Sequence, residues 1–414
     1  MKMKDYKVLR FETDCLQQEF DEYCEQHPHG SLLQESAWSQ VKANWESYRV
    51  AVRDEEGICA AAQILSRRIG LGFHLFYIPR GPLIDYSDTW LCRFFFSHLK
   101  DWAKEKKAAF IKIDPLILDS KVSADGTEEH DLNPEAVEQL KKLGFIHHGR
   151  TMKFDDTAQP RTQAVIDLTR ERKPDKKLKY YLNHAKKKGV KVMRMKEDGV
   201  ALFTKLEEKT ANRKNIALRS EEYFRTLMHV YCDKANISIA YIDIEDSLAS
   251  ENARLEQLNK QIQNPQYKEA KKAEIAEQIA STEKSVDVLK QMKEKYGKTV
   301  YISGALIIRS GQYSELLYAG MDEDLSIYRS NSSFQDAVDW AKENGCRYCN
   351  LGGVEGTLDD SLTGYKKLYS PDFESYIGEF DLPVIKPVYY AVDKLIPAVR
   401  KINTVLARRE KKNG

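Results

Sequence analysis

Residues 349–383, CNLGGVEGTLDDSLTGYKKLYSPDFESYIGEFDLP, hold the densest group of side chains that could take part in chemistry. A short apolar strand is expected to end at Gly352-Gly353, because glycine permits a sharp backbone turn. An acidic stretch follows, and Lys366 and Lys367 then stand beside two tyrosines. A cation next to a glycine turn and aromatic rings suits binding of an anion or stabilisation of a developing oxyanion. On these residues alone, a solvated surface turn with ordinary lysines remains the simpler interpretation.

Composition limits the classes of protein to consider. The chain has 414 residues, enough for two or three domains, and 42% hydrophobic residues, enough for a core. The net charge is only +2, so any nucleic-acid surface must be local. We expect a cytosolic protein, because there is neither a signal-peptide pattern at the start nor an apolar stretch approaching the roughly 20 residues of a membrane span.

The seven cysteines are spread over the chain and fit reduced thiols rather than a disulfide framework. Cys346 and Cys349 form one C-x-x-C pair. A zinc site needs a second pair of ligands at suitable spacing, and none is evident. The pair also follows a helix-like run and enters a strand, whereas a redox pair normally begins a helix. Buried core thiols are therefore the prediction.

Strand-like and helix-like patterns alternate along the chain, which predicts two successive α/β units with mixed sheets. In the first unit we expect a helix over 89–107, with Ser87 or Asp88 as its N-cap. The strands expected there cover 48–54, 58–68, 73–81 and 109–115. In the second unit the expected strands cover 164–169, 190–195, 237–244, 299–310, 313–321 and 349–353. The helices expected there lie near 174–188, 197–213, 220–234 and 331–344.

Residues 246–297 form a different kind of segment. Glycine is absent until Gly297, and apolar residues follow heptad spacing on either side of Asn264-Pro265. This pattern predicts an antiparallel helical hairpin, an inserted coiled-coil arm. It contains nine Lys/Arg and nine Asp/Glu. A neutral arm is a poor clamp for phosphates, so packing or partner contact is favoured over RNA contact.

The segment 172–196 is the better candidate for binding nucleic acid. It holds eleven Lys/Arg and one acid, with Tyr180, Tyr181 and His184 interleaved. Cations could contact phosphates and the rings could stack on bases. Anionic lipid remains an alternative partner, and the basic, amphipathic C-terminal tail could also lie on such a surface. The lysines that we single out are Lys176, Lys177, Lys186, Lys187 and Lys188.

One motif could suggest a different enzyme. Residues 67–72, RRIGLG, match the R-x-x-G-x-G that binds coenzyme A pyrophosphate in acetyltransferases. That motif works between a strand and a helix N-terminus, where backbone amides face the phosphates. Here it lies between two strand-like runs, so a hairpin turn is expected. The sequence contains no P-loop, no H-E-x-x-H and no G-x-S-x-G.

The segment 349–383 resembles the closing motif of the FemABX family, the tRNA-dependent aminoacyltransferases that build peptidoglycan cross-bridges. The matching pieces are NLGGVEG, SLTGYK and YIGEFD. Other blocks follow in family order over nearly the whole chain: WSQVKANW at 38–45, YIPRGPLIDY at 77–86, IDP at 113–115, LRSEEYF at 218–224 and LYAGMDE at 317–323.

The resemblance implies an α/β fold of two acetyltransferase-like (GNAT-like) subdomains. The first covers 1–153, with 384–414 packing back on it. The second covers 154–245 and 298–383, and 246–297 is the inserted arm. Larger members of the family carry such arms, which resemble the tRNA-gripping arm of seryl-tRNA synthetase.

The resemblance also implies the reaction: an amine of a muramyl stem peptide attacks the ester of an aminoacyl-tRNA. The ester supplies the driving force, so no cofactor, ATP or metal is expected. Lys366 matches the lysine that stabilises the ester oxygen. Lys42 and Arg219 match positions that hold the precursor's diphosphate. The remaining matches are Tyr223 and Tyr318, which line the muramyl peptide site, and Asp114, which orients the amine or acts as base.

Lipid-linked and nucleotide-linked precursors both fit this reading, and the arm and basic tail favour the lipid-linked one. Peripheral contact with the anionic inner face of the membrane is then expected. Two other functions stay open at this point. One is an N-acyltransferase of related fold that uses acyl-CoA. The other is a non-catalytic module that binds membrane or RNA.

Overall fold

The structure is a computed structural model that describes residues 8–171, 175–214, 219–328 and 331–394. The chain forms two compact units, which are interleaved in sequence. Unit 1 comprises the described parts of 1–170, 309–315 and 346–414, and unit 2 comprises those of 171–308 and 316–345. The domain boundaries expected from the sequence stay a prediction.

A mixed sheet forms the centre of unit 1, with strand order β1-β2-β3-β4-β6-β17-β9 and β5 paired to β3. Neighbouring strands are antiparallel except for the parallel pair β4–β6. The strands are β1 (Arg10–Glu12), β2 (Glu46–Arg53), β3 (Ile58–Gly70), β4 (Phe73–Ile78), β5 (Leu83–Ile84), β6 (Ala108–Ile113), β9 (Ile146–His147) and β17 (Phe380–Pro383).

Alternate residues of this sheet face two different helices, as the two-residue period of a strand requires. On one face, Val50 and Val52 pack in the core with helix α3 (Thr89–Glu105). On the other, Ala51 packs with helix α1 (Gln17–Gln26). The sequence predicted Ser87 or Asp88 as the N-cap of α3, and the structure shows Asp88, which accepts a 2.9 Å hydrogen bond from the Leu91 amide. The short helices α2 (Ala37–Val41) and α4 (Pro134–Lys142) complete this part.

Unit 1 also contains five strands in the order β15-β10-β16-β7-β8, and the first residues of β14 pair with β15 in parallel. Strand β10 is antiparallel to both of its neighbours, so this sheet is mixed as well. Short helix α11 (Ser361–Lys367) connects β15 to β16. The strands are β7 (Leu118–Val122), β8 (Glu128–Glu129), β10 (Thr162–Asp167), β14 (Tyr313–Met321), β15 (Tyr348–Val354) and β16 (Asp372–Tyr376).

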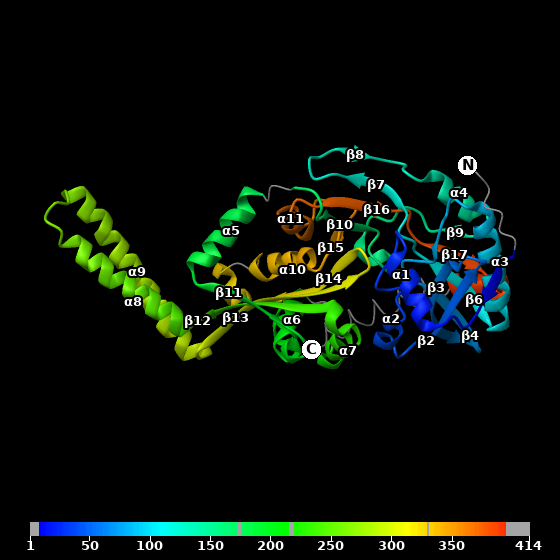
Figure 1. The fold of residues 1–414 in the computed structure, drawn as a ribbon, viewed down its shortest axis with the longest axis horizontal. Coiled ribbons are helices and arrows are strands. Elements are labelled where there is room, and N and C mark those ends of the chain that lie inside the picture. The colour runs from blue at the N-terminus through cyan, green and yellow to red at the C-terminus, as the bar shows by residue number, and fades with distance from the viewer. Residues whose placement is uncertain (1–7, 172–174, 215–218, 329–330, 395–414) are drawn as a thin grey trace. The chain divides into compact units, whose positions relative to one another are not determined.

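Unit 2 is built on strands β11 (Val190–Met195), β12 (Ala235–Asp243), β13 (Thr299–Ser310) and the rest of β14, in that order. In Figure 1, α5 and α10 lie on one side of these strands and α6 and α7 on the other. The helices are α5 (Lys176–Lys187), α6 (Val200–Lys214), α7 (Glu221–Tyr231) and α10 (Asn331–Glu343). Short 3-10 turns occur at Phe154–Asp156, Glu197–Gly199, Cys232–Lys234 and Glu323–Tyr328.

The predicted arm is present as the antiparallel pair α8 (Ile244–Ile262) and α9 (Glu269–Tyr296), which extends away from β12 and β13 (Figure 1). The two helices bury the expected apolar seam, including Leu258, Ile275 and Val286. At the base of the arm, Leu289 and Met292 join the core formed by β12 and β13. Because that apolar contact is continuous with the core of unit 2, the arm is anchored at its base.

Two smaller predictions are confirmed. Residues 67–70 end strand β3 and residues 71–72 form the turn to the antiparallel strand β4, so the motif does not begin a helix that could bind coenzyme A. Cys346 and Cys349 are buried free thiols. Burial raises the pKa of Cys349 to about 12, which keeps it protonated and unreactive. Among the described helices, none combines the length and the apolar run that crossing a membrane requires.

Candidate functional site

The segment 349–383 places its lysines by a strand, a loop and a short helix. Strand β15 ends beyond Gly353, and two acids of the loop that follows make hydrogen bonds to the backbone. Asp360 is the N-cap of α11, accepting hydrogen bonds from the amides of Leu362 and Thr363. The Glu355 carboxylate accepts one from the Phe154 amide at 3.0 Å. Asp360 therefore fixes the start of α11, and Glu355 connects the loop to Phe154.

Lys366 is the lysine that this arrangement buries. Its side chain is 4% exposed, and its Nζ donates to the Gly353 carbonyl oxygen at 2.8 Å. Lys367 is exposed, and its Nζ donates to the Leu358 carbonyl oxygen at 3.1 Å. A buried ammonium acts in a medium where charge interactions are much stronger than in water. Of these two lysines, Lys366 is thus the better placed to stabilise negative charge.

Asp114 lies at the end of β6 and is held from three directions. It is 3% exposed. The Arg80 amide donates to its Oδ1 at 2.7 Å and the Tyr77 hydroxyl donates to its Oδ2 at 3.1 Å, while the Arg80 guanidinium lies 3.8 Å from Oδ2. Burial raises the pKa of Asp114 to about 6, and Arg80 opposes that rise. The carboxylate is therefore fixed in position and poised to change charge near neutral pH.

A short chain of contacts within unit 1 links Lys366 to Asp114. Gly353, which accepts from Lys366, packs so closely on Pro160 that a Cβ added to it would lie 2.2 Å from the Pro160 Cβ. The Pro160 carbonyl oxygen in turn accepts from the Arg80 Nη2 at 2.8 Å. The structure thus connects two residues that are 252 positions apart in the sequence.

Sequence reasoning did not identify Arg80. This residue is 4% exposed, adopts the left-handed conformation with φ of 56°, and lies over the Tyr376 ring at 5.6 Å. Such a conformation is uncommon outside glycine, asparagine and aspartate and is often found at functional positions. An arginine directly before Gly81-Pro82, inside a block that matches the family, is the signal that could have found it.

Lys42 follows α2 as its C-cap residue and is half-buried. Its ammonium lies 5.0 Å from the centre of the Trp38 ring, a cation–π distance. Trp38 and Val41 are buried, so they hold the helix on which Lys42 depends. The side chain is positioned by an aromatic ring, and a role for it in binding diphosphate stays a prediction.

Three predicted residues come together in unit 2. Tyr318 on β14 donates from its hydroxyl to the Tyr223 hydroxyl at 3.1 Å, and both rings pack against Phe224. Burial raises the pKa of Tyr223, so its hydroxyl stays protonated. Arg219 is exposed and its guanidinium lies 5.3 Å from the Tyr223 ring centre. Ser220 caps α7 by accepting from the Tyr223 amide, which fixes this arrangement at the helix start.

The basic segment forms helix α5 and strand β11, and all five singled-out lysines are exposed on α5 or directly after it. Arg172 and Lys173 lie outside the described residues, as does the basic tail from 395 onward. Three aromatic rings lie close together on the same helix: the Tyr180 ring centre is 5.9 Å from that of Tyr181 and 6.1 Å from that of His184. The expected combination of cations and rings is therefore displayed on one helix.

Comparison with known proteins identifies what the chain resembles. Residues 16–396 match the model of the FemAB family. The chain is 28% identical to the lipid II:glycine glycyltransferases of Staphylococcus aureus (strain USA300) and Staphylococcus epidermidis (strain RP62A), covering 95% of this chain and 98% of each relative. Among solved structures, the crystal structure of FemX superposes with a TM-score of 0.79 at 25% identity, covering 92% of this chain and 99% of FemX.

Proposed function

This chain belongs to the FemAB family, and we propose that it transfers an amino acid from aminoacyl-tRNA to an amino group in the stem peptide of lipid II. The observation that carries this proposal is the buried Lys366 ammonium at the end of β15, in a chain that matches the family over residues 16–396. The relatives at 28% identity are named for lipid II and glycine. They make a lipid-linked acceptor and glycyl-tRNA the first substrates to test.

The reaction is an aminolysis of an ester. The acceptor nitrogen bonds to the ester carbonyl carbon, and the bond from that carbon to the ribose oxygen of the tRNA breaks. The proton lost by the amine ends on the ribose oxygen. The amine must be neutral to attack, and deprotonating a lysine-like amine at pH 7 costs roughly 4–5 kcal/mol. A carboxylate that holds or accepts the amine proton offsets part of that cost.

Each site residue has a role in this scheme. Lys366 stabilises the oxygen of the tetrahedral intermediate, a contribution worth about 3–4 kcal/mol for one positioned donor. Asp114 orients the amine and takes its proton. Lys42 and Arg219 hold the diphosphate, one as a point charge and the other as a planar fork. Tyr223 and Tyr318 line the muramyl peptide site. An acceptor of this kind places the enzyme in the cytoplasm at the inner face of the plasma membrane.

One assay tests the proposal. The purified protein is incubated with lipid II and a panel of charged tRNAs, and the products are read by mass spectrometry. A mass increase of one amino acid residue, abolished by ribonuclease, is the expected result. Transfer from acyl-CoA that survives ribonuclease would contradict it, as would a precursor left unmodified by every charged tRNA.

A further inference from the structure

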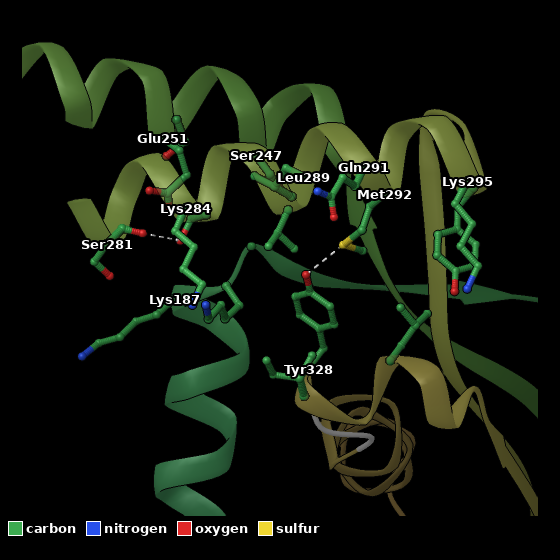
Figure 2. Close-up of a pocket in the computed structure, with 18 of the residues that line it drawn as sticks. Lys187, Ser247, Glu251, Ser281, Lys284, Leu289, Gln291, Met292, Lys295 and Tyr328 are labelled. Atoms are coloured by element: carbon green, nitrogen blue, oxygen red, sulfur yellow. Dashed lines mark hydrogen bonds between the residues drawn. The ribbon is translucent and has the colours of Figure 1, made fainter. Parts of the chain in front are cut away.

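A cavity of about 600 Å³ lies in unit 2 between the base of the arm and the end of α5. Figure 2 shows α9 on one side of the cavity and the end of α5 on the other, with Lys284 extending from α9 toward Lys187. Below them, Tyr328 points toward Met292. The Tyr328 hydroxyl donates to the Met292 sulfur at 3.0 Å. The cavity therefore has an apolar floor joined to the core of the unit and polar walls above it.

Its walls are fixed where α5 meets α8. Gly189 approaches so closely that an added Cβ would lie 2.7 Å from the Ser247 hydroxyl oxygen. Lys191 Nζ also lies 2.6 Å from Asp246 Oδ2. These contacts connect the residues that follow α5 to the start of the arm.

The cavity is lined by more cations than acids. Five lysines border it: Lys186, Lys187, Lys188, Lys284 and Lys295. Lys295 pairs with Asp324 at 3.4 Å, whereas the other four form no ion pair within the described part of the chain. One further acid, Glu251, lines the wall. Like charges gathered around one recess repel each other, and an anionic ligand relieves that repulsion.

Hydroxyl donors accompany the cations. Ser247, Ser250 and Ser281 line the same cavity, as does Ser285, whose hydroxyl donates to the Ser281 carbonyl oxygen at 3.1 Å. Lysine ammoniums together with serine hydroxyls form the usual set of partners for phosphate oxygens. The cavity thus combines charge and neutral donors in the way that phosphate recognition requires.

We propose that this cavity, which we call the arm-base pocket, binds the phosphodiester backbone of RNA. The proposal rests on the proposed function, which supplies aminoacyl-tRNA as donor, and adds where the RNA is held. The arm then acts as one wall of the pocket, and its charge-balanced outer part is not needed for binding.

RNA is favoured over a lipid surface by two observations. The cations border a concave surface between two helical walls, which fits a strand better than a flat bilayer. They also continue along α5 to Lys176 and Lys177, and Tyr180, which is 61% exposed, offers a stacking face between the two groups. Ten residues of helix span about 15 Å, the length of several consecutive phosphates.

The decisive test compares two triple variants that remove equal charge. K186Q/K187Q/K188Q changes the pocket, and K260Q/K271Q/K272Q changes the outer part of the arm. Binding of fluorescently labelled tRNA is followed by anisotropy over a range of KCl concentrations. We expect the pocket variant to raise Kd about 10- to 100-fold and to reduce the slope of log K against log salt by about 2 to 3. The outer variant should stay within twofold of the parent.

A second variant tests the cavity rather than the charge. S285F fills the pocket and leaves every lysine in place, so we expect it to weaken tRNA binding at least fivefold while the thermal midpoint of the protein is kept. E251Q should strengthen binding two- to threefold, because it removes the acid facing the phosphates. Equal effects of the two triple variants, or parental binding by S285F, would overturn the proposal.

Two further measurements distinguish this proposal from membrane binding and from the proposed transferase function. Sedimentation with phosphatidylglycerol vesicles should not distinguish the two triple variants; selective loss of vesicle binding with unchanged tRNA binding would assign the pocket to the membrane. In the transfer assay, the pocket variant should raise KM for aminoacyl-tRNA and keep kcat. If no transfer occurs with any tRNA, the proposed function fails while the RNA-binding comparison still decides the pocket.

Discussion

The Lys366 ammonium lies 2.8 Å from the carbonyl oxygen of Gly353, at the point where β15 ends and the acidic loop begins. Gly353 and Lys366 are 13 positions apart in the sequence. Lys366 lies on α11, whose N-cap is Asp360. The contact fixes the direction of a long side chain that would otherwise sample many rotamers.

Replacing this ammonium tests its role in the reaction. Lys366→Met should lower turnover by roughly 10²–10³-fold, because one positioned donor to the oxyanion is lost. The measurement is the rate of amino acid transfer to lipid II at saturating substrates. Lys367→Met is the matched control, since its exposed side chain should be replaceable with little loss. Equal effects of the two substitutions, or normal turnover in Lys366→Met, would remove the assignment.

The carbonyl that positions Lys366 can be displaced without touching the lysine. Gly353→Ala introduces a Cβ only 2.2 Å from the Pro160 Cβ, well inside van der Waals contact, so we expect a loss of about 1–3 kcal/mol in stability together with lower turnover. Gly364→Ala in α11 is the control, because no atom lies within 4 Å of its added Cβ. Chemical denaturation of both variants gives the comparison. A Gly353→Ala protein as stable as the parent would show that β15 and Pro160 separate easily.

The charge of Asp114 predicts a pH dependence. With a pKa of about 6, Asp114 is protonated in acid and ionised above neutrality. If it takes the amine proton, kcat/KM should rise with pH through about 6 and Asp114→Asn should be slow at every pH.

Because the folded-state pKa of Asp114 lies above the ordinary value of 3.8, the folded protein binds one more proton than the unfolded chain at pH values between the two. Ionising Asp114 should therefore reduce stability as pH rises from about 4 to 6. A kcat/KM profile without an inflection near 6 would exclude the base role.

Arg80 should set the position of that inflection. Its guanidinium lowers the pKa of Asp114, opposing burial, so Arg80→Gln should move the rise in kcat/KM to higher pH. A displacement of one unit lowers the ionised fraction at pH 6 from one half to about one eleventh, so kcat/KM at pH 6 falls about fivefold. Arg93→Gln, on the exposed side of α3, serves as the control. An unshifted profile in a folded Arg80→Gln protein would mean that Arg80 has only a structural role.

Arg219 and Lys42 should act on substrate binding rather than on the chemical step. Arg219→Gln is expected to raise KM for lipid II about 10-fold or more with kcat little changed, because binding of the diphosphate is the same in ground and transition states. Arg225→Gln is a matched control on α7, where the arginine pairs with Glu221 at 2.6 Å and points to solvent. Lys42→Gln should resemble Arg219→Gln. A fall in kcat with unchanged KM would assign these residues to another step.

Sequence patterns predicted most of the elements because those elements depend on local properties. The heptad spacing of the arm, the strand-like runs of β3 and β12, and the Asp88 cap are all readable from neighbouring residues, and the structure confirms them. The choice of Lys366 over Lys367 came from the register of a family motif, and burial of Lys366 alone supports it.

The tertiary structure decided which distant residues meet. Strand β17, late in the chain, pairs with β6 near its start, and β7 pairs with β16, so both of these pairings join segments more than 240 residues apart. No local pattern encodes such pairings, because they depend on the packing of whole sheets. The same reason explains why Arg80 was missed: its partners Asp114, Pro160 and Tyr376 are assembled from three different segments. The sequence by itself determined the helices, the strands and the kind of chemistry, and the fold decided which charges are buried together and what they hold.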